Sequence, residues 1–235
     1  MTVYRLRKSM TVPTAELILE TVRPLDFENS ISLRGFIGRR FLENIFLHNH
    51  NGGSLIYSYP RVQYKIIDSK ARIIGLAEGV EAIKNISYFE KIILGNEDVK
   101  VEGIDLSEAQ CIFGISEDQQ TYSFFTPWLA LNKENHKRYL KIIGWQARKE
   151  FLANILIGNI ISISKSLGYT VPEPIKVSLG KMKEIKTSLK GTPMLGFLGT
   201  FSVNFEIPDY WGIGKSVSRG FGTIKRVEPA KENKT

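Results

Sequence analysis

The order in which strand-like and helix-like patterns follow one another constrains the fold of this chain most strongly. In the first half, alternating apolar residues rich in β-formers predict strands, and apolar residues at three- and four-residue spacing predict helices. In chain order we expect a strand at 15–22, a helix from Ser30 or Ser32 to about Phe46, strands at 54–67 and 71–76, a helix at about 78–93 and a strand within 99–115. This β-α-β-β-α-β order is that of a ferredoxin-like module.

A comparable order begins again near Thr121. A strand at 122–131 and a long helical region at 133–167, expected to kink at Gly158, precede three further strands, and the second helix of the plan is missing or very short. Those three strands are expected at 176–179, 183–189 and 195–205. We therefore predict an α+β fold of two tandem ferredoxin-like (RRM-like) modules, residues 1–118 and 119–235, with antiparallel sheets and helices on one face.

A glycine-rich segment at 210–224 follows these strands. It holds two Gly-x-Gly pairs around a short polar run, and Ile224 and Val227 then alternate with basic residues as in a strand. Glycines let the backbone turn, and N–H groups freed in this way can form a concave nest for anionic oxygens. The residues predicted to bind phosphate are Gly212, Gly214, Lys215, Ser218, Arg219, Gly220 and Gly222.

The glycine-rich segment does not match two well-known phosphate-binding patterns. It is no dinucleotide fingerprint, because no helix follows it, and no Walker loop, because Gly214-Lys215-Ser216 lacks the earlier glycine. A glycine-rich hairpin without a ligand is the alternative.

The charge of the chain favours an anionic partner. Lys and Arg outnumber Asp and Glu by 32 to 24, a formal net charge of +8, as is common for proteins that bind nucleic acid or a membrane surface. The single cysteine, Cys111, excludes an internal disulfide and a cysteine-cluster zinc site. No secretory leader and no apolar run of transmembrane length are present, so we expect a soluble cytoplasmic protein without a membrane partner.

The helical region from Lys133 separates two faces. We expect its apolar stripe to face the core, which makes His136 structural; the stripe consists of His136, Leu140, Ile143, Ala147 and Phe151. The basic residues Lys137, Arg138 and Lys141 lie away from that stripe and are predicted to follow RNA phosphates. A solvated basic face is the alternative.

Two of the three histidines, His48 and His50, lie in a loop rich in Asn and Gly. Two imidazoles close together can serve as base and acid, the two roles that RNA backbone cleavage by the 2′-hydroxyl needs. Tyr57 could orient the nucleophile, and Arg40 could stabilise the charge of the transition state. A zinc site is the second interpretation, although it wants further ligands beyond His-x-His, and a polar surface turn is the third.

The glycine pattern at 212–222, the run 33–38, the His-Asn-His at 48–50 and the run 57–65 together resemble a known family. This is the b-type branch of the Cas-six endoribonucleases, which cut precursor CRISPR RNA within its repeats. The resemblance implies a catalytic group of His48, His50, Tyr57 and Arg40, where relatives carry lysine at the last position. It also implies cleavage without a metal or other cofactor, leaving a 2′,3′-cyclic phosphate and a 5′-hydroxyl.

The expected partner is CRISPR repeat RNA, as precursor and as mature guide. Other proteins of a CRISPR interference complex and a second copy of the chain are further candidate partners. A guide-RNA-binding subunit that does not cut is the alternative function, and a metal-dependent hydrolase using His48 and His50 is the third.

Overall fold

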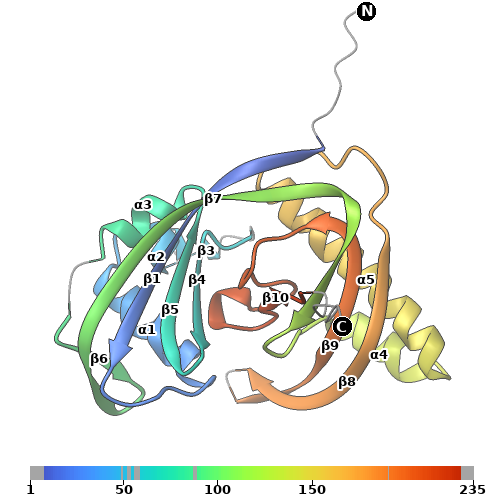
Figure 1. The fold of residues 1–235 in the computed structure, drawn as a ribbon. Coiled ribbons are helices and arrows are strands. Elements are labelled where there is room, and N and C mark those ends of the chain that lie inside the picture. The colour runs from blue at the N-terminus through green and yellow to red at the C-terminus, as the bar shows by residue number, and fades with distance from the viewer. Residues whose placement is uncertain are drawn as a thin grey trace, which may run out of the picture.

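The computed structural model describes residues 8–48, 50–51, 54–55, 59–86, 89–189 and 191–228, with backbone alone at 48, 50–51 and 54–55. Strands of two halves meet along one long strand, β7, as Figure 1 shows. The helices are α1 (Asn29–Arg40), α2 (Ile45–His48), α3 (Gly79–Lys84), α4 (Lys133–Lys141), α5 (Trp145–Ser166) and the 3₁₀ helix η1 (Val217–Arg219). The strands are β1 (Ser9–Thr21), β2 (His50–Asn51), β3 (Ser54–Leu55), β4 (Val62–Ile67), β5 (Lys70–Leu76), β6 (Lys91–Leu94), β7 (Glu97–Phe124), β8 (Val177–Leu189), β9 (Thr192–Glu206) and β10 (Ile224–Arg226).

The first half has the strand order of a ferredoxin-like module. Its strands lie in the order β4-β5-β1-β7 and all pair antiparallel. Leu17 of β1 lies opposite Ile73 on one side and Leu106 on the other. Taken as the first, second, third and fourth strands of the module, β1, β4, β5 and β7 give the order 2-3-1-4, which confirms the predicted fold.

The second half repeats this order with β7 as its first strand. Its strands lie in the order β8-β9-β7-β10, again antiparallel. The three residues of η1 stand where the second helix would be, as predicted from the sequence. The predicted boundary at residue 118 falls inside β7, which serves both modules, and it stays a prediction.

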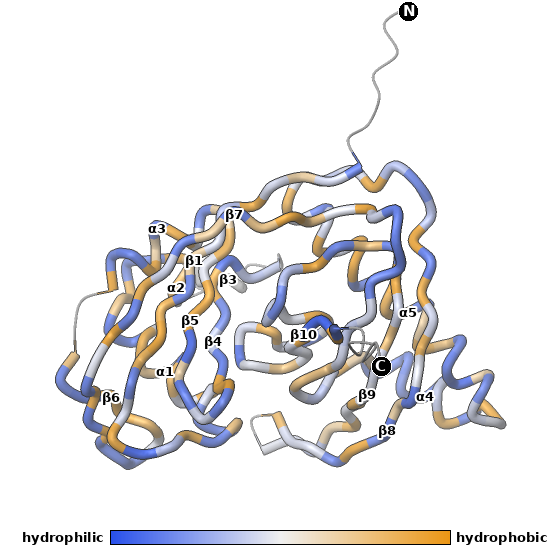
Figure 2. The backbone as a smooth tube through the Cα atoms, in the orientation of Figure 1, coloured by the Kyte–Doolittle hydropathy of each residue, from blue (hydrophilic) through white to orange (hydrophobic). Residues whose placement is uncertain are grey.

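Apolar residues gather in two clusters that correspond to the two modules. Helices α1 and α3 pack on the strands of the first module, and α5 packs on β8 of the second. Figure 2 shows apolar and polar residues mixed along β1, where burial alternates with the period-two pattern of a strand with one buried face, whereas the last four residues of β5 are all buried. Each fully buried Leu, Ile or Phe contributes roughly 1.5–3 kcal/mol to stability.

The first module differs from the prediction at two helices. The helix predicted to reach Phe46 ends at Arg40, because the Asn44 side chain accepts from Phe46 N and so favours a new start at α2. The helix predicted at 78–93 is α3 alone, and the last three residues of that range belong to β6. In β6, Ile92 and Leu94 are buried while their neighbours are exposed, which is the period of a strand.

The second module differs in its helix break and strand ends. The break lies at Gly144, where φ is 86°, so α4 and α5 are separate and α5 continues through Gly158. The strand predicted at 122–131 ends at Phe124, and the two strands predicted within 176–189 are one strand, β8, with a bulge between Leu179 and Met182. Among the helices that the structure describes, none is long and apolar enough to cross a membrane.

Candidate functional site

The glycine-rich segment lies between the two modules and contacts both, as the central red segment of Figure 1 shows. From β4, Gln63 Oε1 accepts from Gly212 N at 2.9 Å, and Lys65 Nζ donates to Thr223 Oγ1 at 3.0 Å. From α1, the Ser30 hydroxyl lies 2.8 Å from the carbonyl oxygen of Arg219 and 2.7 Å from that of Phe27, and it shares its single proton between these two acceptors. The first module therefore fixes the position of a segment that belongs to the second.

Glycine is required in this segment for packing against the protein itself. At Gly222, where φ is 63°, a Cβ atom would lie 1.9 Å from the carbonyl oxygen of Ile213. At Gly212 it would lie 2.6 Å from Cβ of Val217. No side chain fits such distances without a shift of the backbone.

At three of these glycines the backbone N–H group is not available for the predicted phosphate nest. The N–H of Gly212 donates to Gln63, that of Gly220 to the Val217 carbonyl, and that of Gly222 to the Pro127 carbonyl at 2.9 Å. These groups are satisfied within the protein, so in this structure they are not offered to an anion. Gly214 and Ser218 also lie in the segment, and a part for either in RNA binding stays a prediction.

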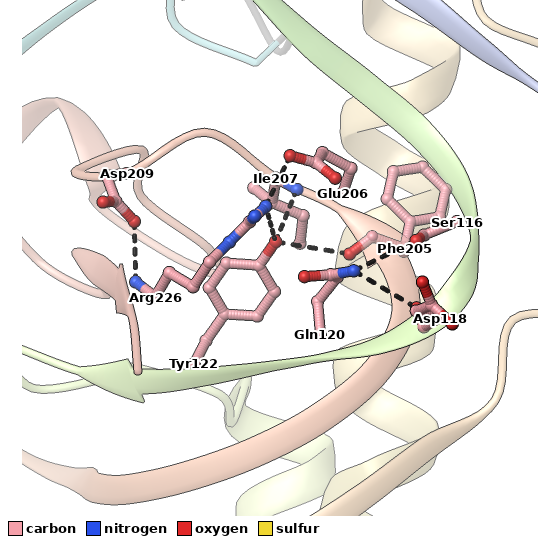
Figure 3. Close-up of polar contacts among 9 residues, drawn as sticks. All are labelled: Ser116, Asp118, Gln120, Tyr122, Phe205, Glu206, Ile207, Asp209 and Arg226. Atoms are coloured by element: carbon pink, nitrogen blue, oxygen red, sulfur yellow. Dashed lines mark hydrogen bonds and ion pairs between the residues drawn. The ribbon is translucent and has the colours of Figure 1, made fainter. Parts of the chain in front are cut away.

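A polar cluster joins the two ends of the glycine-rich segment. Asp209 Oδ1 accepts from Arg226 N at 2.6 Å, and the Arg226 guanidinium contacts Glu206 and the Tyr122 hydroxyl. Figure 3 shows Tyr122 of β7, Glu206 of β9 and Arg226 of β10 converging, with Asp209 in the loop after β9. These contacts hold the residues just before and just after the glycine-rich segment together, so the segment forms a closed loop.

Lys65 is completely buried beneath the glycine-rich segment. Its amine makes a hydrogen bond to Thr223, which in turn donates to the Gly220 carbonyl at 2.9 Å, and no carboxylate pairs with it among the described residues. Burial lowers the pKa of Lys65 from 10.5 to about 7. An amine of this kind is held neutral over much of the basic pH range.

The histidine segment, residues 47–53, follows directly from α1 through α2. His48 is the last residue of α2 and His50 begins β2, which pairs with β3. The side chains of both histidines, and Tyr57 as a whole, lie outside the described residues. The backbone just before them is fixed, because the buried Tyr64 hydroxyl donates to the Leu47 carbonyl at 3.1 Å.

Arg40 is exposed at the last position of α1, and its guanidinium lies over the ring of Phe89, 5.4 Å from the ring centroid. Its predicted catalytic part stays a prediction. Lys215 is exposed and lines a cavity of about 420 Å³ together with residues of α4 and α5. The structure therefore does not bring Lys215 and Arg40 together through any described contact.

Arg34 of α1 is a further basic residue beside the glycine-rich segment, and the sequence analysis gave it no role. In the structure it is half-buried, and its Nε is buried without a hydrogen-bond partner among the described residues. It is near Arg219, whose pKa is lowered by burial and, to a smaller degree, by repulsion from Arg34. Position 34 is one turn beyond Ser30, which bonds the Arg219 carbonyl 189 positions away, and no local pattern in the sequence marks that contact.

The predicted core stripe of the helix from Lys133 was wrong. Tyr139 is the buried residue of α4, whereas His136 is exposed, Leu140 is 60% exposed and Ile143 is 94% exposed. Within α4 the buried face is the one that carries Tyr139, and the break at Gly144 ends the helical period, so no single stripe continues from α4 into α5. The basic residues Lys137, Arg138 and Lys141 are exposed on α4, which Figure 1 shows at the outer edge of the second module, away from β2 and β3.

Among the side chains that the structure describes, no three histidine, cysteine, aspartate or glutamate residues gather as a metal site. The side chains of His48 and His50 are not among those described, so the zinc interpretation of the histidine segment is not tested.

Two ferredoxin-like modules that enclose a glycine-rich segment, with a histidine pair in the first module, define a class of CRISPR-associated RNA-binding protein. A model of the Cas6b N-terminal domain matches residues 10–112, and a model of the Cas6b C-terminal domain matches residues 114–227. The chain therefore belongs to the Cas6b family.

Solved structures and one sequence relative are similar to this chain. A crystal structure of Cas6b matches with a TM-score of 0.86 at 36% identity, and one of the CRISPR RNA processing endoribonuclease Cas6b with 0.75 at 34% identity; each covers 93% of this chain and 100% of the other. Csf5, a CRISPR-Cas type IV Cas6 crRNA endonuclease, shares the fold at 12% identity, with a TM-score of 0.51 over 93% of this chain and 100% of its own. The uncharacterized protein MJ0978 of Methanocaldococcus jannaschii is 47% identical over 116 residues, which are 49% of this chain and 78% of that protein.

Proposed function

We propose that this chain is an endoribonuclease that cleaves precursor CRISPR RNA within its repeats, without a metal, by attack of a 2′-hydroxyl on the adjacent phosphorus. Membership of the Cas6b family supports the substrate and the type of reaction. The single observation that carries the proposal is the position of α1, which bonds the glycine-rich segment through Ser30 and leads through α2 into the histidine segment.

The proposed chemistry divides two proton transfers between two imidazoles. One of His48 and His50 takes the proton of the 2′-hydroxyl as its oxygen bonds to phosphorus, and the other gives a proton to the departing 5′-oxygen. The products are a 2′,3′-cyclic phosphate and a 5′-hydroxyl. Tyr57 orients the attacking group, and Arg40 stabilises the negative charge that gathers on the phosphate oxygens.

RNA binding in this proposal depends on the basic side chains of the glycine-rich segment, Lys215 and Arg219, and on the basic face of α4. The glycines contribute by letting the segment pack tightly between the modules, so that these side chains are held in place. The mature guide RNA, other interference-complex proteins and a second copy of the chain are proposed partners that no contact in the structure tests.

The test is cleavage of labelled repeat RNA in chelator by three proteins: wild type, His50→Ala and His136→Ala. His136 is the matched control, because it is the exposed third histidine and lies on α4. We expect wild type and His136→Ala to cut equally, and His50→Ala to bind RNA with near wild-type affinity without cutting. Equal cutting by His50→Ala would remove that histidine from the mechanism.

Two outcomes would favour the alternative functions. Tight binding by wild type with intact RNA at stoichiometric protein favours a guide-RNA-binding subunit that does not cut. Cleavage that stops in chelator and returns with added zinc favours a metal-dependent hydrolase.

A further inference from the structure

Arg34 of α1 and Arg219 of η1 are two like charges for which the described protein supplies no counter-charge. Neither guanidinium makes a hydrogen bond or an ion pair with a described residue, and Arg34 Nε is buried without a partner. Burial lowers the pKa of both arginines, and in Arg219 repulsion by Arg34 lowers it further. The two groups are therefore half-buried, near enough for their charges to interact, and without a counter-charge among the described residues.

Such an arrangement is unfavourable in the free protein. An ionised group removed from water costs free energy unless it is paired, and two like charges add repulsion. Arg39 of the same helix avoids this cost by being exposed, and Arg72 avoids it by pairing with Glu16. An unpaired charge that the fold retains is typical of a binding site, because the bound ligand can supply the counter-charge.

The fold holds both arginines in place from their backbones. The Ser30 hydroxyl lies 2.8 Å from the carbonyl oxygen of Arg219, and Ser30 is one helical turn before Arg34. Thr126 and Thr223 both donate to the carbonyl of Gly220, the next residue. The spacing between α1 and η1 is thus set by hydrogen bonds that leave both guanidiniums free.

Arg34 also lies next to the start of the histidine segment. Its charge interacts with the Tyr64 hydroxyl, where burial raises the pKa of Tyr64 and the nearby guanidinium lowers it in part. The same hydroxyl donates to the carbonyl of Leu47, the residue before His48. The Tyr64 hydroxyl therefore links Arg34 to Leu47, the first residue of the histidine segment.

We propose that Arg34 and Arg219 together bind a single phosphate group of the RNA backbone, beside the bond that is cut at the histidine segment. This inference rests on the proposed function and adds a residue, Arg34, that the glycine-rich segment itself does not contain. A phosphodiester fits because guanidinium forks match its oxygens, and two forks approaching from α1 and η1 can hold different oxygens of the same group. A bound phosphate also supplies the counter-charge that both arginines lack.

The test is a double-mutant cycle of RNA affinity in a His50→Ala background, with Arg34→Met, Arg219→Met and the double variant. Methionine keeps the length and the helix propensity of arginine while removing its charge. Arg23→Gln is the matched control, since it removes an arginine whose partner is an exposed carboxylate, Glu97. Urea unfolding of each free protein accompanies the binding curves.

We expect each single substitution to weaken RNA binding by roughly 10- to 100-fold. The double variant should lose much less than the product of the two single losses, because both arginines bind the same group. The free Arg34→Met protein should unfold at the same or a higher urea concentration than its parent, because a buried unpaired charge is gone. Arg23→Gln should bind RNA like its parent.

Three outcomes would overturn the inference. The first is strictly multiplicative losses, which place the two arginines on separate phosphates. The second is a destabilised Arg34→Met protein with unchanged RNA affinity, which makes Arg34 structural. The third is a double variant that keeps its RNA affinity but is no longer stabilised by inorganic phosphate, whereas wild type is. That result makes free phosphate the ligand.

Failure of this inference and failure of the proposed function give different results. If wild type cuts repeat RNA in chelator and the arginine variants bind normally, the phosphate site alone is wrong. If wild type does not cut but the cycle shows coupling, the phosphate site stands within a protein that binds RNA without cleaving it.

Discussion

The buried amine of Lys65 predicts an unusual dependence of stability on pH. Its pKa is lowered from 10.5 to about 7, so at pH 8 the folded protein holds Lys65 neutral while the unfolded chain still binds a proton there. Where the unfolded state binds more protons, the free energy of unfolding rises with pH. We therefore expect stability to increase from about pH 7 upward on account of this residue.

The size of the effect follows from the same pKa values. A lowered lysine pKa contributes about 1.4 kcal/mol for each pH unit within its window, hence roughly 3 kcal/mol between pH 7 and pH 9. Below about pH 7 the folded state also protonates Lys65, and the full cost of burying the ammonium group remains. The buried tyrosines, whose pKa values are raised, act in the opposite direction only above about pH 10, so the window from 7 to 9 isolates the lysine.

The assay is urea unfolding of wild type, Lys65→Met and Lys70→Met at intervals between pH 6 and pH 9. Lys70 is the matched control, because it is half-exposed on the neighbouring strand β5 and pairs with Glu20. Lys65→Met should be more stable than wild type at pH 6, and the difference should shrink by about 3 kcal/mol on reaching pH 9. A difference between wild type and Lys65→Met that does not change with pH would refute the reasoning, because it would mean that Lys65 titrates alike in both states.

Three further predictions concern the contacts that place the glycine-rich and histidine segments. Gly222→Ala should lower the free energy of unfolding by more than about 2 kcal/mol, because it adds strain at positive φ and a clash with Ile213. The control Gly168→Ala, at φ of 73° with open space around it, should cost only about 1 kcal/mol. Equal losses in urea unfolding would contradict this. Tyr64→Phe should slow cleavage with little change in RNA affinity, because it releases the Leu47 carbonyl, and single-turnover rates beside binding curves would show it; an unchanged rate would contradict it. Ser30→Ala should cost about 1 kcal/mol of stability by freeing the Arg219 carbonyl, and an unchanged urea midpoint would argue against that bond.

The strand plan could be predicted from the sequence because its signals are local. Alternation along β1 and the turn at Asp68 and Ser69, both with positive φ, identify the hairpin and the central strand of the first module. The absence of a full second helix in the second module could also be predicted, since the glycine-rich segment holds no helical pattern of apolar residues. Element ends were less predictable, because Asn44 and Gly144 act through capping and backbone conformation, not through apolar spacing.

The candidate site could be predicted only in part. The histidine pair and the glycine-rich segment follow from residue types in sequence, but their relation depends on contacts across 149 to 189 positions, such as Gln63 with Gly212 and Ser30 with Arg219. The inward position of Lys65 and Arg34 depends on which face of β4 and α1 the other module covers. No local pattern carries that information.

The chemistry of the cut ends tests the central proposal most directly. Repeat RNA is incubated with wild type in chelator, and both fragments are analysed for their terminal groups. The account predicts a downstream fragment that polynucleotide kinase labels without prior phosphatase treatment, and an upstream fragment that resists periodate because it ends in a 2′,3′-cyclic phosphate. A downstream 5′-phosphate with an upstream 3′-hydroxyl would contradict attack by the 2′-hydroxyl and, with it, the part assigned to the two histidines.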